Sequence, residues 1–406
     1  MLSSFGCFNQ LYSQSRYNII YEPNLGMNFG AENIASTHYL WQKFDNRFIP
    51  NEIFKKKNFG AKVGNISYRL TKLFLLDYPL SFVLPTLQHE RFGHGPRITE
   101  FNGNISSINI TLPPPFQSSF PYISYLSSNL STIQQELMIS AGGSEANEVL
   151  GNIIRKNILL DNELDYHNAL LYLYANNDLS GYANFAPNIS GSDISNYVST
   201  INGYYGNTEL TLKKIQLYGA LSIILDPFNY YSFNSLFNGY IWKGKNKSKI
   251  PLIRITDNLK YLPKFKFGFA PYGPELTLQN YFKHNSRLYS FSFSSSDGSF
   301  GNSWRLGAEI WNVKFNDQFS MNFLGQIWNQ QNINFYVNNQ LENSESFGGL
   351  FINTVNYDFY SKETILGLTL QFGYKSKGFS VGEKLNHGLI IRGGITFRIK
   401  PVENKT

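Results

Sequence analysis

Two of the six histidines in this chain lie five residues apart, with a glutamate directly after the first, in the segment His89-Glu90-Arg91-Phe92-Gly93-His94. Zinc hydrolases use two neutral imidazoles as metal ligands, a carboxylate that takes a proton from the attacking water, and a further protein ligand from elsewhere in the chain. The segment holds three of these four groups. It therefore predicts a zinc site in which His89 and His94 bind the metal and Glu90 is the general base.

The five-residue spacing places a demand on the helix that carries it. Each residue of an α-helix turns by about 100°, so a side chain five positions later points about 140° away. A regular helix cannot present both histidines to one metal ion. A single π-type turn would align them by absorbing one extra residue, and Gly93 makes that distortion easier.

The segment resembles the HELLGH motif of the dipeptidyl peptidase III family, in which the same expanded spacing binds zinc. The resemblance covers six of 406 residues. It implies that His89 and His94 are zinc ligands and that Glu90 is the general base of a peptidase. The chain is much shorter than members of that family and has a different C-terminal half, so the resemblance concerns the site and not the fold.

The third ligand in that family is a glutamate on a later helix. The nearest counterpart here is Ala141-Gly-Gly-Ser-Glu-Ala-Asn-Glu148, in which Glu145 and Glu148 are three positions apart and share a helix face. We expect Glu145 to complete the metal site, with Glu148 as the other candidate. A structural interpretation stands beside this one, because the histidines can serve as buried hydrogen-bonding groups and an acid after Gly-Gly suits a helix N-terminus.

The elements that must position these residues fall into three regions. Residues 1–64 contain short extended pieces, Tyr17–Tyr21 and Gly60–Gly64, which we expect to be strands. Residues 65–254 have a helical pattern and carry the histidine motif. Helices are expected over 132–160, 163–175 and 210–225, and antiparallel packing would bury the site between them.

Residues 255–406 alternate with a period of two, which indicates antiparallel strands of about ten residues. The last segment shows it best, because Arg392 and Thr396 lie on one face and apolar residues on the other. These apolar residues are Leu389, Ile391, Ile395 and Phe397.

We therefore predict an α+β fold: an antiparallel transmembrane β-barrel, with the helical domain inserted between N-terminal strands and the C-terminal strands. Aromatic residues make up 16% of the chain and charged residues only 16%, against about 25% charged in typical soluble proteins. The C-terminal region resembles bacterial outer-membrane β-barrel proteins, which implies an outer-membrane location in the cell envelope. A soluble β-domain, with its apolar face as core, is the alternative.

The formal net charge is +7, but the basic residues are scattered. This pattern favours contact with membrane lipid over a nucleic-acid groove. The single cysteine, Cys7, excludes an internal disulfide. The N-terminal residues do not read as a secretory signal, and no run of 18 apolar residues predicts a spanning helix.

The predicted function is that of a membrane-associated zinc-dependent hydrolase, a metallopeptidase that acts on a peptide or protein with a metal-activated water. Arg91 or Arg97 is a candidate to support a substrate carboxylate or a developing oxyanion. Two alternatives remain open from the sequence. One is a non-catalytic outer-membrane barrel, structural or for transport, with a helical plug, and the other is a zinc-dependent esterase or lipid deacylase.

Overall fold

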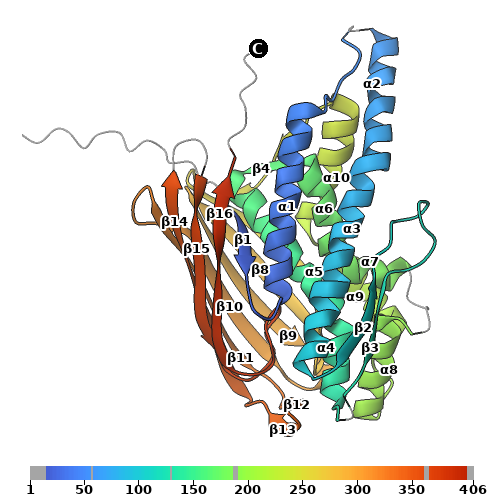
Figure 1. The fold of residues 1–406 in the computed structure, drawn as a ribbon, viewed down its shortest axis with the longest axis vertical. Coiled ribbons are helices and arrows are strands. Elements are labelled where there is room, and N and C mark those ends of the chain that lie inside the picture. Colours follow the sequence, from blue (N-terminus) through green and yellow to red (C-terminus); the bar gives the residue numbers. More distant parts are fainter. Residues whose placement is uncertain (1–14, 56–57, 129, 186–190, 361–364, 400–406) are drawn as a thin grey trace, which may run out of the picture.

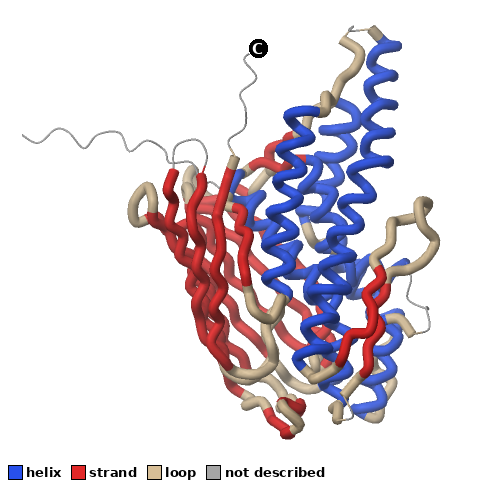
Figure 2. The backbone as a smooth tube through the Cα atoms, viewed as in Figure 1, coloured by secondary structure: helices blue, strands red, loops and turns tan. Residues whose placement is uncertain are grey.

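The structure is a computed structural model and describes residues 15–55, 58–128, 130–185, 191–360 and 365–399. Ten strands form one large antiparallel sheet, and a bundle of helices covers one of its faces (Figure 1, Figure 2). The mixed α+β class and the antiparallel sheet are therefore confirmed. Cys7 lies outside the described residues.

Most of the sheet comes from the C-terminal region, as the alternation predicts. The order of strands across it is β1-β16-β15-β14-β11-β10-β9-β8-β7-β6. Two further hairpins, β2–β3 and β12–β13, and a short β4–β5 pair lie outside it. The strands are β1 (Tyr17–Tyr21), β2 (Asn104–Asn109), β3 (Tyr122–Leu126), β4 (Glu163–Asp165), β5 (Lys247–Lys249), β6 (Ile253–Arg254), β7 (Leu259–Ala270), β8 (Gly273–His284), β9 (Arg287–Ser296), β10 (Trp304–Lys314), β11 (Phe319–Asn329), β12 (Asn334–Val337), β13 (Gln340–Asn343), β14 (Phe347–Tyr360), β15 (Ile365–Lys375) and β16 (Gly388–Arg398).

The predicted strand Tyr17–Tyr21 is present as β1 and joins the sheet beside the last strand, with Tyr17 opposite Phe397. The predicted closed barrel is not observed. Within the described residues the sheet ends at β1 on one side and β6 on the other, and these two edges do not pair. Helices stand on the side where the edges would have to meet, and α1 packs directly against β1. Helices therefore cover the open side of the sheet, and the strands do not close it into a barrel.

The helices are more extensive than the sequence predicts. The segment Gly60–Gly64 is helical and not a strand, because the side chain of Asn58 accepts the Ala61 N–H and so starts a helix there. The helices are α1 (Met27–Phe48), α2 (Phe59–Lys72), η1 (Leu73–Asp77), α3 (Tyr78–His89), η2 (Glu90–His94), α4 (Gly95–Glu100), α5 (Ile133–Asp161), α6 (Tyr166–Asn176), α7 (Asp178–Phe185), α8 (Asp193–Tyr205), α9 (Leu212–Ile224), α10 (Pro227–Asn234), η3 (Ser235–Trp242) and η4 (Gly298–Phe300).

Segments α2 to α4 form one continuous helix over Phe59–Glu100. By length and composition it is the one helix among the described residues that is long and apolar enough to cross a membrane. The sequence still contains no run of 18 apolar residues, and the expectation that no helix spans a membrane stays a prediction.

Helix α5 is the longest single α-helix and confirms the helix expected over 132–160. Thr132 and Gln135 form a capping box at its start. Its end is fixed from the sheet, because the Lys283 ammonium donates to the carbonyls of Leu159 and Leu160 at 2.6 and 2.9 Å. The next helix begins later than expected, at Tyr166, because residues 163–165 pair as β4 with β5.

The two faces of the sheet differ in polarity, and the apolar face is the uncovered one. On β16, Leu389 and Ile391 are 77% and 62% exposed, whereas Arg392 and Thr396 are 3% and 0% exposed beneath the helices. The same face carries exposed apolar side chains on the neighbouring strands: Leu278, Phe291, Phe293, Ile327, Phe351, Leu366, Leu368, Leu370 and Phe372. The soluble alternative required the apolar face to be the core. In the structure this face is exposed.

Candidate functional site

The histidine motif lies at a π-turn. The backbone N–H of Gly95 bonds to the carbonyl of Glu90, five residues earlier, over the π-helical segment η2. This confirms the distortion that the spacing requires. It places the rings of His89 and His94 side by side, with their centroids 4.9 Å apart and an angle of 68° between the planes.

The glycines of α5 bring a second helix unusually close to this turn. A Cβ atom on Gly143 would lie 2.2 Å from Nε2 of His89, and one on Gly93 would lie 2.6 Å from the carbonyl oxygen of Gly142. Neither contact is possible for a real side chain. The Gly-Gly pair therefore serves to seat the His89 ring against the backbone of α5.

The acidic group that faces both imidazoles is Asp193, the first residue of α8. One of its carboxylate oxygens lies 3.2 Å from Nε2 of His89 and 3.2 Å from Nε2 of His94. Ser192 caps the helix through its side chain, which accepts the Ser195 N–H and fixes the start of α8. His89, His94 and Asp193 each offer one ligand atom, and these atoms lie within 4.8 Å of one another.

The other ring nitrogens are occupied. Nδ1 of His89 lies 2.9 Å from the carboxylate of Asp178, and Nδ1 of His94 lies 2.7 Å from the carbonyl oxygen of Ile139. Each partner is an acceptor, so each Nδ1 carries the proton. In neutral rings both Nε2 lone pairs then face the Asp193 oxygen, an arrangement that needs either a cation among the three atoms or a second proton on each ring.

The charges of these residues shift one another's pKa values. Burial alone would lower the pKa of His89 and His94, but the charge of Asp178 raises the pKa of His89, and that of Asp193 raises the pKa of His94. Burial alone would raise the pKa of Asp193, yet the charges of His94 and His89 hold it well below its ordinary value. As neutral rings, His89 and His94 would offer two acceptors to a divalent cation beside the ionised Asp193, whereas without a cation these shifts favour protonated rings.

Glu90 borders the same cavity as the two histidines and Asp193. Its side chain is almost completely buried, and this burial raises the pKa of the carboxyl above its ordinary value. A raised pKa is what a carboxylate needs to accept a proton from water at neutral pH. Glu90 lies beside the ligand group and not within it, and its role as general base stays a prediction.

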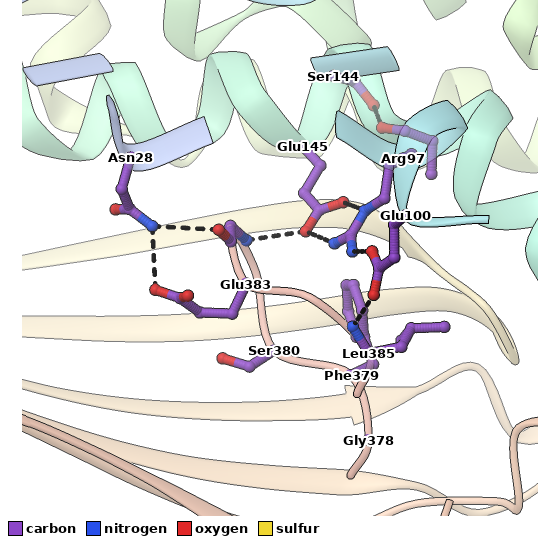
Figure 3. Close-up of polar contacts among 12 residues, drawn as sticks. Asn28, Arg97, Glu100, Ser144, Glu145, Gly378, Phe379, Ser380, Glu383 and Leu385 are labelled. Atoms are coloured by element: carbon purple, nitrogen blue, oxygen red, sulfur yellow. Dashed lines mark hydrogen bonds and ion pairs between the residues drawn. The ribbon is translucent and has the colours of Figure 1, made fainter. Parts of the chain in front are cut away.

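Glu145 does not lie with the histidines, and its prediction as the third ligand is wrong in placement. Its carboxylate forms a buried ion pair with Arg97, at 2.5 Å, and accepts the Gly382 N–H at 2.8 Å (Figure 3). Arg97 also pairs with Glu100, at 2.9 Å. The glutamate thus holds the end of the motif helix to the loop before β16.

The remaining predicted residues also have other partners. Glu148 pairs with Lys266 of β7. Arg97 is committed to Glu145 and Glu100, and Arg91 borders a separate cavity with Glu22. Neither arginine is among the described residues that line the cavity of Glu90, so neither oxyanion assignment is supported.

Two residues of the site were missed. Asp193 stands about a hundred positions after the motif, where Ser-Asp at a helix start reads as ordinary capping. Tyr182 lines the same cavity, and burial raises the pKa of its phenol to about 12, so it remains a proton donor. Among 27 tyrosines, no sequence signal distinguishes it.

A second group of metal-ligating type, Asp45, Asp77 and His167, is fully buried among the helices. The ammonium of Lys72 already lies between its carboxylates, 2.9 Å from Asp45 and 3.0 Å from Asp77. The cation position is therefore taken by a side chain. This cluster joins α1, the motif helix and α6.

Comparison of the chain with protein-family models, with curated proteins and with solved structures gives no match.

Proposed function

We propose that this protein is a membrane-associated, zinc-dependent hydrolase in which His89, His94 and Asp193 hold the metal. The observation that carries the proposal is the convergence of two Nε2 atoms on one Asp193 oxygen while both Nδ1 atoms are fixed by acceptors. Carboxylate and carbonyl partners of this kind orient histidine ligands in zinc sites. Three protein ligands leave a position for water, as in catalytic zinc sites.

A zinc ion held there would lower the pKa of water and polarise a carbonyl. The protein residues supply the rest of the reaction. Glu90 accepts a proton from the attacking water and returns it to the leaving group, and the phenol of Tyr182 donates a hydrogen bond in the same cavity. Peptide bonds are the first substrate to test, and esters are the alternative.

The membrane association rests on the polarity of the sheet. Its outer face presents rows of exposed apolar side chains on at least six strands, while its inner face is polar and covered. Soluble proteins rarely expose a continuous apolar surface of this extent. We propose that the face contacts lipid, and that the protein lies in the bacterial outer membrane.

Metal analysis tests the site directly. We expect about one zinc per chain in the purified protein and its loss in the His89→Ala/His94→Ala double variant. The matched control is His387→Ala, which changes an exposed histidine. Equal zinc in all three proteins would refute the site and favour the structural alternative, in which protonated imidazoles hold the carboxylates.

A second variant separates the base from the ligands. Glu90→Gln should retain zinc and lose about 10²–10⁴-fold in hydrolysis rate, because the amide cannot accept the proton. Zinc content and turnover are measured on the same sample. Loss of zinc in this variant would make Glu90 a ligand and reverse its assigned role.

A further inference from the structure

The cavity beside the histidines is large and mostly apolar. Its volume is about 570 Å³, within the range of about 300–1,000 Å³ that holds small-molecule ligands. The site residues occupy one side. The other walls come from α3, the end of α6, α7, β3 and the residues 110–121 that connect β2 to β3, and include Phe82, Leu112, Phe120, Ile123 and Tyr174.

Apart from the two histidines, the charged side chains that line this cavity are acidic. Glu90, Asp178 and Asp193 line it, and no lysine or arginine does so among the described residues. Peptidases that act at a chain end with a free carboxylate need a cation to bind it. This cavity instead suits a substrate that is neutral around the scissile bond.

Aromatic rings lead from the cavity to the outer surface of the motif helix. Phe82 and Tyr174 line the cavity with ring centroids 5.9 Å apart, and Tyr78 lies 6.5 Å from Phe82. The next ring is Phe74, 6.2 Å from Tyr78, and Phe116 lies 5.3 Å beyond it. Phe74 and Phe116 are exposed, so a continuous row of aromatic rings extends from the site to the surface.

We propose that the substrate is a neutral ester or amide that carries an aliphatic acyl chain, and that the chain occupies this cavity. The inference rests on the proposed hydrolase function and names its substrate class. The water oxygen bonds to the acyl carbon, and the bond from that carbon to the ester oxygen or amide nitrogen breaks. Glu90 transfers one water proton to the leaving group, so the products are a carboxylic acid and an alcohol or amine.

Nitrophenyl esters from acetate to decanoate test the chain directly, with the full-length protein in lipid nanodiscs. Each buried methylene contributes about 0.8 kcal/mol, which corresponds to about a fourfold rise in kcat/KM per methylene until the cavity is filled. Phe82→Ala should flatten this rise. Leu341→Ala is the matched control, because Leu341 is exposed on β13, outside the cavity.

A charge exchange tests the polarity of the cavity. Wild type should prefer a neutral decanoyl ester to the same ester with a carboxylate at the chain end by at least about tenfold, since one unfavourable charge contact of about 1.4 kcal/mol has this effect. Tyr122→Lys, which places a cation in the lining, should narrow that preference. Leu341→Lys should leave it unchanged.

Binding of neutral alkyl amides to Glu90→Gln, measured by calorimetry, separates the two proposals. Affinity that rises with chain length without hydrolysis by wild type supports binding of the acyl chain in this cavity and refutes the hydrolase. Zinc-dependent hydrolysis that is independent of chain length refutes the acyl-chain substrate and leaves the hydrolase standing. Absence of both chain-length effects and hydrolysis overturns both.

Discussion

Gly143 decides how the first histidine of the motif is held. Its missing side chain leaves room for the His89 ring, which a Cβ atom would approach to 2.2 Å. The Asp178 carboxylate fixes the other edge of that ring at 2.9 Å. The ring is thus confined between a backbone and a carboxylate, so its orientation depends on a residue without any functional group.

We predict that Gly143→Ala weakens zinc binding about 10–100-fold, the size of effect seen when groups that orient a ligand are lost. The added methyl must displace the His89 ring from Asp193. Zinc titration with a competing chelator measures this change. Gly203→Ala is the control, because this α8 position has open space around it. Unchanged affinity in Gly143→Ala would show that the ring position does not govern metal binding.

Glu145 has the side chain of a metal ligand, but it forms an ion pair with Arg97 and not with a metal. We predict that Glu145→Ala retains zinc and destabilises the protein by about 3–5 kcal/mol, because the Arg97 guanidinium would stay buried without this partner. Denaturant unfolding and metal analysis of the same variant provide the test. If zinc is lost while stability is unchanged, the original ligand assignment holds.

At the scale of elements, a buried ionic cluster fastens three helices to one another. His167 of α6 lies 3.1 Å from Asp45 of α1 and 2.8 Å from Asp165, the residue that caps α6. Burial alone would lower the pKa of His167, but hydrogen bonding to Asp165 and the charge of Asp165 raise it to about 9. The same bonding lowers the pKa of Asp165 to about 2, against the effect of burial.

These shifts predict how stability depends on pH. The raised pKa of His167 contributes stability that is fully present below about pH 6.5, the unfolded value, and is lost as pH rises through about 9. The loss amounts to about 3 kcal/mol. The contribution of Asp165 is present above its unfolded value of about 3.9 and is lost as pH falls through about 2.

The measurement is denaturant unfolding between pH 6 and pH 10, with His167→Gln as the comparison. Wild type should lose stability between about pH 6.5 and pH 9 and little more above that, and the variant should show a flatter profile. The matched control His387→Gln changes an exposed histidine and should retain the wild-type slope of stability against pH. A His167→Gln profile that still falls as steeply would assign the slope to other groups.

At the scale of the whole molecule, the sheet is built with its polar face inward and its apolar face outward. Ile395 is 48% exposed on that outer face, and Leu341 is 60% exposed on the β12–β13 hairpin beyond the sheet (Figure 1). In water, a lysine is tolerated at either position. In a bilayer, only the position outside the hydrocarbon tolerates it.

We predict that Ile395→Lys costs about 2–4 kcal/mol in lipid vesicles if the residue lies near the bilayer midplane, whereas Leu341→Lys is neutral. Unfolding in vesicles measures both. Thr396→Lys should also be destabilising, because Thr396 is fully buried under the helices. A detergent-free, monodisperse monomer with equal stability for Ile395→Lys and wild type would refute the lipid-facing sheet.

The sequence by itself determined the features that depend on local periodicity. Five-residue spacing of the histidines required a π-turn, and η2 supplies it. Alternation in residues 255–406 specified antiparallel strands and their two faces, because side chains in a strand point alternately to opposite sides. The same local rules located α5 through its capping box at Thr132.

Tertiary structure alone decided which distant residues meet. Asp193 reaches the histidines because α8 begins beside them, and Glu145 is drawn away because Arg97 and the Gly382 N–H hold it. The open sheet has the same origin, since the helices that pack against β1 and β7 are set by packing and not by any strand's own pattern. Local sequence fixes the direction of a side chain on its own element. Its partner is selected by burial and charge pairing between elements far apart in the chain.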